Sequence, residues 1–214
     1  LEPTIAVPPP ALEQRIQEMR SRLARLQFEL AAAERNLPAE QEAWGKNFAG
    51  RTNIWTVLDL TNAISLGGAT LTNLPDQSVL ATGPNPIYES YAVDARTRLN
   101  GITAILLETL TDPSLPKNGP GRWDQTGNFI LDEFVATAES AAGGPMAAPV
   151  DFKSAAADWE QDGYPAAHAI DRNPKTGWAI GPKFGQPNFL ILELKNPVGA
   201  TDETKFTFKL EQNH

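Results

Sequence analysis

Apolar residues recur along residues 12–37 with spacings that alternate between four and three. Their positions are Leu12, Ile16, Met19, Leu23, Leu26, Leu30, Ala33 and Leu37. This heptad spacing predicts an α-helix with a narrow apolar seam. Pro10 stands where a first-turn proline is tolerated, and Pro38 is expected to end the helix. The seam indicates either a coiled-coil partner helix or a helix that folds back as a hairpin on residues 39–48 or on a parent protein.

From Arg51 onward the pattern changes to short stretches with β-branched residues and alternating polarity. Strand-like stretches cover 53–60, 67–74, 75–83 after a turn at Asp76-Gln77, 88–95, 101–110, 129–138, 150–161, 188–198 and 204–212. The stretch 101–110 is almost continuously apolar, so we expect burial on both of its faces. No helical pattern interrupts these stretches. The fold class is therefore expected to be mainly β, an antiparallel jelly-roll β-sandwich preceded by an N-terminal α-helix or helical hairpin.

The chain is expected to divide into two parts. Residues 1–49 hold a Pro-rich linker and the heptad-patterned helical segment, and residues 50–214 hold the β-sandwich. The sequence starts in the Pro-rich stretch and stops just after a strand, so we expect a fragment of a longer polypeptide. Residues 111–128 form a long loop rich in proline and glycine, and loops of this length are often functional.

Composition narrows the classes of function. The net charge of −8 argues against a nucleic-acid partner, because phosphate binding needs a basic face. The chain has no cysteine, which excludes disulfides, thiolate catalysis and Fe–S clusters within it. With two histidines, a multi-histidine transition-metal site is not expected. No apolar run is long enough for membrane insertion.

The segment HAIDRNPKTGW, residues 168–178, places oxygen-bearing side chains at near-alternating positions between two strand-like stretches. Asp171, Asn173 and Thr176 have the spacing with which a loop wraps a hard cation. The alternative is an ordinary Asx-type turn, with Trp178 packed in the core beneath it. The residues alone leave both interpretations open.

The longer stretch YPAAHAIDRNPKTGWAIG, followed by NFLILELKNPV, resembles the N-terminal signature of discoidin-like (galactose-binding-like) jelly-roll domains. In that family a strand leads to Ala-x-Asp-Gly-x-x-x-Thr-x-Trp. Asp171, Asn173, Thr176 and Trp178 match the family's pattern, whereas Arg172 stands where the family usually has glycine. The resemblance implies a jelly-roll β-sandwich for this part of the chain.

The same resemblance implies a structural Ca²⁺ ion at this loop. Carried over position by position, its ligands are side-chain oxygens of Asp171, Thr176 and Glu133 and backbone carbonyls of His168, Asn173 and Asp132. In the family the glutamate belongs to a Leu-x-Glu-Ile type motif on the closing strand, which LDEF matches here. Since Glu133 precedes Asp171 in this chain, the resemblance implies a circularly permuted domain or two half-related sheets.

A wider resemblance covers nearly the whole chain. The strings LTDPSLP, GPGR and GNF within residues 110–129, with the permuted motif after them, are similar to a segment of large planctomycete surface proteins that carry a cytochrome-c-like domain. In those proteins a short predicted coil precedes the strand-rich segment. The resemblance implies an exported protein, periplasmic or at the cell surface, with a closing strand just beyond His214.

Enzyme signatures such as G-x-S-x-G, the P-loop and H-E-x-x-H are absent from the sequence, so catalysis is not expected. Discoidin-like domains usually bind glycans through loops at one end of the sandwich. Sugar recognition needs an aromatic platform and polar groups for the hydroxyls. The candidates here are Arg122, Trp123, Asn128 and Tyr164. Tyr88 and Phe184 are instead expected to be half-buried at a sandwich edge.

Two hypotheses follow. The first is a non-catalytic carbohydrate-binding module with structural calcium that targets a larger cell-envelope protein to polysaccharide. The second is a structural spacer that docks partner domains of the same polypeptide, motivated by the heptad seam.

Overall fold

A computed structural model describes residues 10–48, 55–141, 147–200 and 202–213. The Pro-rich linker expected at residues 1–9 lies outside these ranges. The chain divides into two compact units, Leu1–Ile54 and Trp55–His214, which we treat separately.

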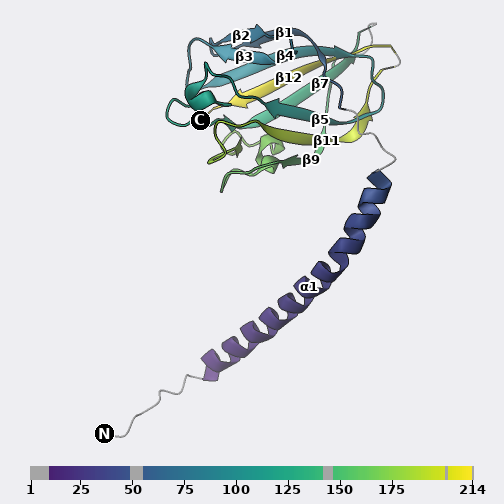
Figure 1. Ribbon diagram of the computed structural model, residues 1–214, viewed down its shortest axis with the longest axis vertical. Coiled ribbons are helices and arrows are strands. Elements are labelled where there is room, and N and C mark those ends of the chain that lie inside the picture. The colour runs from purple at the N-terminus through teal and green to yellow at the C-terminus, as the bar shows by residue number, and fades with distance from the viewer. Residues whose placement is uncertain (1–9, 49–54, 142–146, 201, 214) are drawn as a thin grey trace. The chain divides into compact units, whose positions relative to one another are not determined.

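The first unit contains one helix, α1, which spans Pro10–Phe48 (Figure 1). The prediction that Pro38 ends the helix is wrong, because the backbone stays helical for ten further residues. A proline inside a helix removes one backbone hydrogen bond and bends the helix without necessarily ending it. The hairpin alternative required the chain to reverse direction before residues 39–48. These residues instead continue the same helix.

The second unit is mainly β, as the alternating pattern predicts. Its strands are β1 (Asp59–Ser65), β2 (Thr70–Asn73), β3 (Val79–Thr82), β4 (Glu89–Thr97), β5 (Ile102–Thr109), β6 (Ile130–Leu131), β7 (Glu133–Ser140), β8 (Ala148–Pro149), β9 (Phe152–Ala157), β10 (Trp178–Ala179), β11 (Asn188–Val198) and β12 (Thr204–Gln212). Two short 3₁₀ helices, η1 (Pro116–Asn118) and η2 (Ala166–Ile170), lie in the connections. All strand pairs are antiparallel.

The strands form two main sheets that pack face to face (Figure 1). One sheet has the order β1-β4-β12-β7-β8 and the other β5-β11-β9. The last strand, β12, therefore lies in the middle of the larger sheet, between β4 and β7. β2 and β3 form a separate hairpin, whose turn contains Gln77 with a positive φ of 70°. This arrangement is sandwich-like.

Alternate residues of the central strands fill the space between the sheets. Phe206 and Phe208 of β12 are buried and stack with their ring centroids 5.4 Å apart. Leu190 and Leu192 of β11 are fully buried on the opposite side. Alternation with a period of two is the signature of strands with one face in a core. The expectation for β5 was wrong, since β5 is an edge strand and none of its residues is fully buried.

Candidate functional site: the Asp171–Thr176 loop

Strand pairing brings the Asp171–Thr176 loop next to Glu133. β10 pairs antiparallel with β6, with Trp178 opposite Leu131 and Ala179 opposite Ile130. In an antiparallel pair, the residues before one strand run beside the residues after the other. The loop before Trp178 therefore lies beside the Asp132–Glu133 segment, although about forty residues separate them in the sequence.

Gly177 allows this close approach of the two backbones. A Cβ atom at this position would lie 2.6 Å from Ile130 Cγ2 and 2.9 Å from the Leu131 carbonyl oxygen. Both distances are too short for a side chain, so the position requires glycine. The next residue, Trp178, is fully buried, and its indole Nε1–H donates to the Trp159 carbonyl at 2.9 Å. Trp178 thus anchors one end of the loop in the core.

The loop gathers several oxygen atoms around the Thr176 hydroxyl. Thr176 Oγ1 lies 3.0 and 2.8 Å from the two carboxylate oxygens of Asp171, and 2.9 Å from the Asn173 carbonyl oxygen. The Asp171 carboxylate also accepts the Asn173 N–H at 2.8 Å. A hydroxyl has one proton and can donate to only one of these acceptors at a time. The loop is therefore an Asx-type turn with more acceptor oxygens than protons to share.

Glu133 adds a second carboxylate beside this cluster. Its side chain is 9% exposed, and Oε2 accepts the backbone N–H of Arg172 at 2.8 Å. Burial and, to a lesser extent, the negative charge of Asp171 together raise the pKa of Glu133 to about 7, against the lowering effect of that hydrogen bond. The two carboxylates thus repel each other in the absence of a cation.

Arg172 adopts an unusual backbone conformation to make this contact. Its φ is +61°, in the left-handed region where glycine is favoured. The Arg172 guanidinium reaches out to the Asp151 carboxylate at 3.1 Å. The arginine therefore holds a backbone conformation that glycine adopts more readily.

The two remaining candidate ligands are placed differently. Asp132 is fully buried: its carboxylate accepts the backbone N–H of Asn213, and its own N–H donates to the Glu211 carbonyl at 2.8 Å. His168 lies in η2, which packs between β9 and β7. Its Nδ1 is buried and has no hydrogen-bond partner among the described residues. The Asp132 side chain is thus turned to Asn213, just after β12, which leaves its backbone carbonyl for the predicted role.

The donor set has the chemistry of a hard-cation site. Within the described ranges, no three His, Asp or Glu side chains gather closely enough to hold a metal ion by themselves. An ion at this loop would therefore depend on the carboxylates of Asp171 and Glu133 together with hydroxyl and carbonyl oxygens. Such oxygen donors are preferred by Ca²⁺ over softer metals.

Two of the four residues predicted to bind a ligand, Arg122 and Asn128, make hydrogen bonds within the protein instead. The Arg122 guanidinium donates to the carbonyls of Gly83 at 2.7 Å and Pro84 at 2.9 Å. Asn128 donates from Nδ2 to Gln161 Oε1 at 3.0 Å, and its Oδ1 accepts the Ile180 N–H. Both side chains hold loops together. Their hydrogen-bonding capacity is therefore largely used within the protein.

The other two predicted residues are aromatic. Tyr164 is partly buried in the loop after β9, whereas Trp123 is 57% exposed. The expectation for Tyr88 was wrong, because this side chain is 69% exposed, while Phe184 is half-buried as expected. Tyr88 and Trp123 belong to two loops that Arg122 fastens together. Sequence reasoning missed this pairing because no spacing in the sequence signals a bond between residues 39 positions apart.

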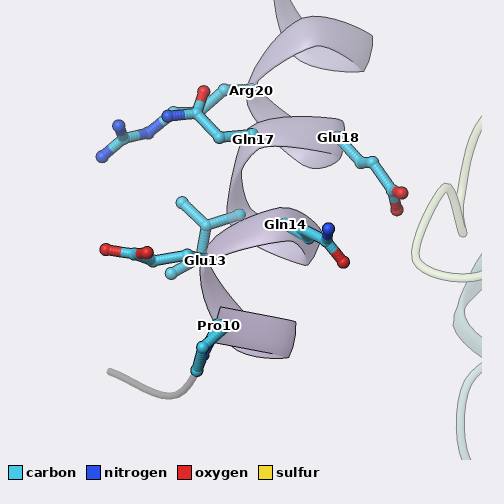
Figure 2. Close-up of a pocket in the computed structure, with 7 residues that line it drawn as sticks. Pro10, Glu13, Gln14, Gln17, Glu18 and Arg20 are labelled. Carbon is cyan, nitrogen blue, oxygen red and sulfur yellow. The ribbon is translucent and has the colours of Figure 1, made fainter. Parts of the chain in front are cut away.

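A hollow along the first turns of α1 is lined by Pro10, Glu13, Gln14, Ile16, Gln17, Glu18 and Arg20 (Figure 2). In Figure 2, Glu13 and Arg20 point to one side of the helix and Gln14 and Glu18 to the other. Side chains that diverge in this way do not converge on a ligand, so we assign no site to it.

No described helix is both long and apolar enough to cross a membrane. Comparison with known proteins adds no relative, since no protein-family model, curated protein or solved structure matches the chain.

Proposed function

We propose that residues 55–214 form a discoidin-like jelly-roll domain that binds carbohydrate without catalysis and is stabilised by Ca²⁺. The observation that carries the calcium part is the convergence of Asp171, Asn173 and Thr176 oxygens beside the buried Glu133 carboxylate. A cation there would neutralise the carboxylates of Asp171 and Glu133, which otherwise repel each other. It would also be bound by the loop oxygens that receive no hydrogen bond from the single Thr176 proton. The order of the segments agrees with a permuted domain, because the segment with Glu133 precedes the loop in the chain.

The carbohydrate part rests on an exposed aromatic surface, which we call the Tyr88–Trp123 rim. Arg122 donates to the carbonyls of Gly83 and Pro84, and Asn85 Nδ2 donates to the Arg122 carbonyl at 2.8 Å. These bonds fix the loop that ends at Tyr88 against the loop that contains Trp123. Exposed aromatic rings on a rigid support are the platform on which sugar rings stack.

The rim and the Asp171–Thr176 loop belong to the same end of the larger sheet. Tyr88 precedes β4 at Glu89, Glu133 begins β7, and β12 pairs Gln212 with Glu89 and Glu211 with Glu133. A cation that stiffens the loop would therefore stiffen the end of the sheet that carries the rim. In this proposal the domain attaches a larger exported protein to polysaccharide of the cell envelope.

Calcium binding is tested by thermal unfolding of the whole chain with EDTA and with CaCl₂. A single cation site at a hundredfold excess over its Kd should add about 2.7 kcal/mol to the free energy of unfolding. Asp171→Ala should lose this gain. Asp76→Ala is the matched control, because Asp76 Oδ1 accepts the Ser78 N–H at 3.0 Å in a similar exposed turn without a second carboxylate. Equal calcium responses of the parent and Asp171→Ala would refute the site.

Carbohydrate binding is tested by affinity electrophoresis in gels that contain acidic or neutral polysaccharides. The parent should be retarded by at least one of them, and Trp123→Ala should abolish the retardation. Trp55→Ala is the control. Trp55 is also exposed, at 47%, but it precedes the start of β1, and the end of that strand is the part near the rim. If no polysaccharide retards the calcium-loaded protein, the carbohydrate proposal fails while the calcium site is judged separately.

The alternative function, a spacer that docks partner domains of the same polypeptide, is supported by a different observation. The apolar seam of α1 is largely exposed within its unit. Both functions are compatible within one chain.

A further inference from the structure

Most of the apolar stripe of α1 is exposed within its own unit. Six of its side chains, each 48–60% exposed, are Leu12, Met19, Leu23, Leu26, Leu30 and Leu37. Together with Ile16 and Ala33 they recur at alternating spacings of four and three, which places them on one face of the helix. A stripe of this kind is the surface on which helices associate.

We propose that α1 pairs with α1 of a second copy of this chain in antiparallel orientation. The stripe is symmetric about the midpoint between Ala24 and Arg25. When a second copy is reversed about this midpoint, Leu12 faces Leu37, Met19 faces Leu30 and Leu23 faces Leu26. Each apolar residue of this set then meets an apolar residue of the other copy, and no part of the stripe overhangs. The pairing is independent of the proposed carbohydrate binding.

The flanking charges favour the same orientation. Arg22 and Glu29 each precede an apolar residue of the stripe, at equivalent positions beside the seam. In the antiparallel pair, Arg22 of one copy lies next to Glu29 of the other, and symmetry makes this contact twice. Charges at such positions set the orientation of paired helices. Both side chains are exposed, and the Glu29 carboxylate, which also pairs with Arg25 of its own helix, would be shared with Arg22 of the other copy.

A parallel pair in register would be opposed by the charges. Residues beside the seam then face residues five positions further along the other helix. Arg15 would face Arg20, again twice by symmetry, and Arg22 would face the uncharged Gln27. Glu29 would likewise face Glu34, so the parallel arrangement has four repulsive contacts. The antiparallel one has two attractive contacts, Arg22 with Glu29, and two repulsive ones, Glu13 with Glu34, and is therefore the less repulsive of the two.

The test is sedimentation equilibrium of the whole chain, whose mass is 23.2 kDa as a monomer. The parent is expected to form a dimer that dissociates on dilution. Arg22→Glu should raise the dimer Kd by roughly tenfold, because two attractive contacts become repulsive. Adding Glu29→Arg to it should restore the parent Kd. A parent that stays monomeric at high micromolar concentration would overturn the proposal.

Arg25→Glu is the matched control for charge reversal. Arg25 makes an ion pair with Glu29 of its own helix at 3.3 Å and is not beside the seam. Its reversal changes the helix charge by the same amount and breaks the ion pair within the helix, but Arg22 and Glu29, the two residues of the contact between copies, both remain. The Kd should change little, and circular dichroism should show the same helix content in all variants. Equal weakening by Arg22→Glu and Arg25→Glu would count against the assigned register.

Orientation is read from one spin label at Gln14→Cys, which is the sole cysteine because the chain has none. Reversal about the midpoint puts the two labels about 30 Å apart along the axis, whereas a parallel pair holds them within about 20 Å. The longer distance supports the proposal. The shorter one refutes it, whatever the oligomeric state.

Discussion

Replacement of Glu133 by glutamine tests the electrostatics of the Asp171–Thr176 loop. Glutamine has nearly the same shape, and its amide oxygen can still accept the Arg172 N–H that Glu133 Oε2 accepts at 2.8 Å. It removes only the charge that burial and Asp171 disfavour. In the absence of calcium, the variant should therefore be more stable than the parent at neutral pH.

The size of the effect follows from the raised pKa of Glu133. A shift from 4.5 to about 7 corresponds to roughly 3 kcal/mol at most. The carboxyl lies beside an exposed loop, so hydration reduces this figure, and we expect about 1–2 kcal/mol. Because the folded-state pKa lies above the unfolded one, the folded state holds the proton more tightly. The parent therefore loses stability as the pH rises from 4.5 to about 7, whereas Glu133→Gln lacks this loss.

The assay is thermal unfolding of both proteins in EDTA across pH 4.5 to 8. The two melting temperatures should coincide near pH 4.5 and then separate, with the variant higher by roughly 3–6 °C at pH 7.5. With CaCl₂ at pH 7.5 the parent should instead have the higher melting temperature, because the Glu133 carboxylate binds a cation more strongly than the neutral amide of glutamine does. If the difference between the two proteins in EDTA does not change with pH, the assigned pKa and the repulsion with Asp171 are both wrong.

Three further predictions concern residues that hold the fold. Burial raises the pKa of Glu89, but hydrogen bonds from Ser65 Oγ at 2.7 Å and the Gly67 N–H at 2.8 Å outweigh it and lower that pKa. Glu89→Ala should thus cost about 3 kcal/mol in urea unfolding near pH 7, and the difference from the parent should shrink as the pH falls below the usual glutamate range. Arg122→Lys should leave the melting temperature nearly unchanged but should increase proteolysis within residues 83–88, because a lysine ammonium cannot reach the carbonyls of Gly83 and Pro84 together. Unchanged cleavage would show that the loop does not depend on the guanidinium. Phe206→Ala should cost about 3–5 kcal/mol, since its ring is 1% exposed in the core; a loss below 1 kcal/mol in urea unfolding would contradict that packing.

The regular strands were the most predictable part of the fold. Alternation placed 204–212 and 188–198 with the bounds that β12 and β11 have in the structure. The predicted strand 129–138 is broken into β6 and β7, because Asp132 turns into the interior, where its carboxylate accepts the Asn213 N–H. The end of α1 was missed because a sequence cannot show whether a proline bends a helix or ends it. Propensity sets local preferences, and tertiary contacts decide between them.

The site was predictable to the extent that it lies in one segment. The spacing of Asp171, Asn173 and Thr176 gave the local cluster of oxygens, and the resemblance alone supplied Glu133. The Tyr88–Trp123 rim was only half predicted, because it depends on hydrogen bonds from Arg122 to residues 38 and 39 positions earlier. Charged and amide side chains in a loop look available for ligands in a sequence. Only the three-dimensional structure shows that Arg122 and Asn128 are engaged within the protein.

Arg172 connects the turn, the repulsion between carboxylates and the proposed cation. A left-handed conformation costs an arginine roughly 1 kcal/mol more than a glycine, so the position should favour glycine unless the conformation is compensated. The compensation within the protein is modest: one hydrogen bond from the backbone N–H to Glu133, which glycine would also make, and one exposed ion pair with Asp151. The guanidinium, however, also offsets part of the Glu133 charge. An arginine at this position therefore lessens the effect of the repulsion between Glu133 and Asp171 when no cation is bound. As a result, calcium should stabilise this loop less than it would stabilise the same loop with glycine at position 172.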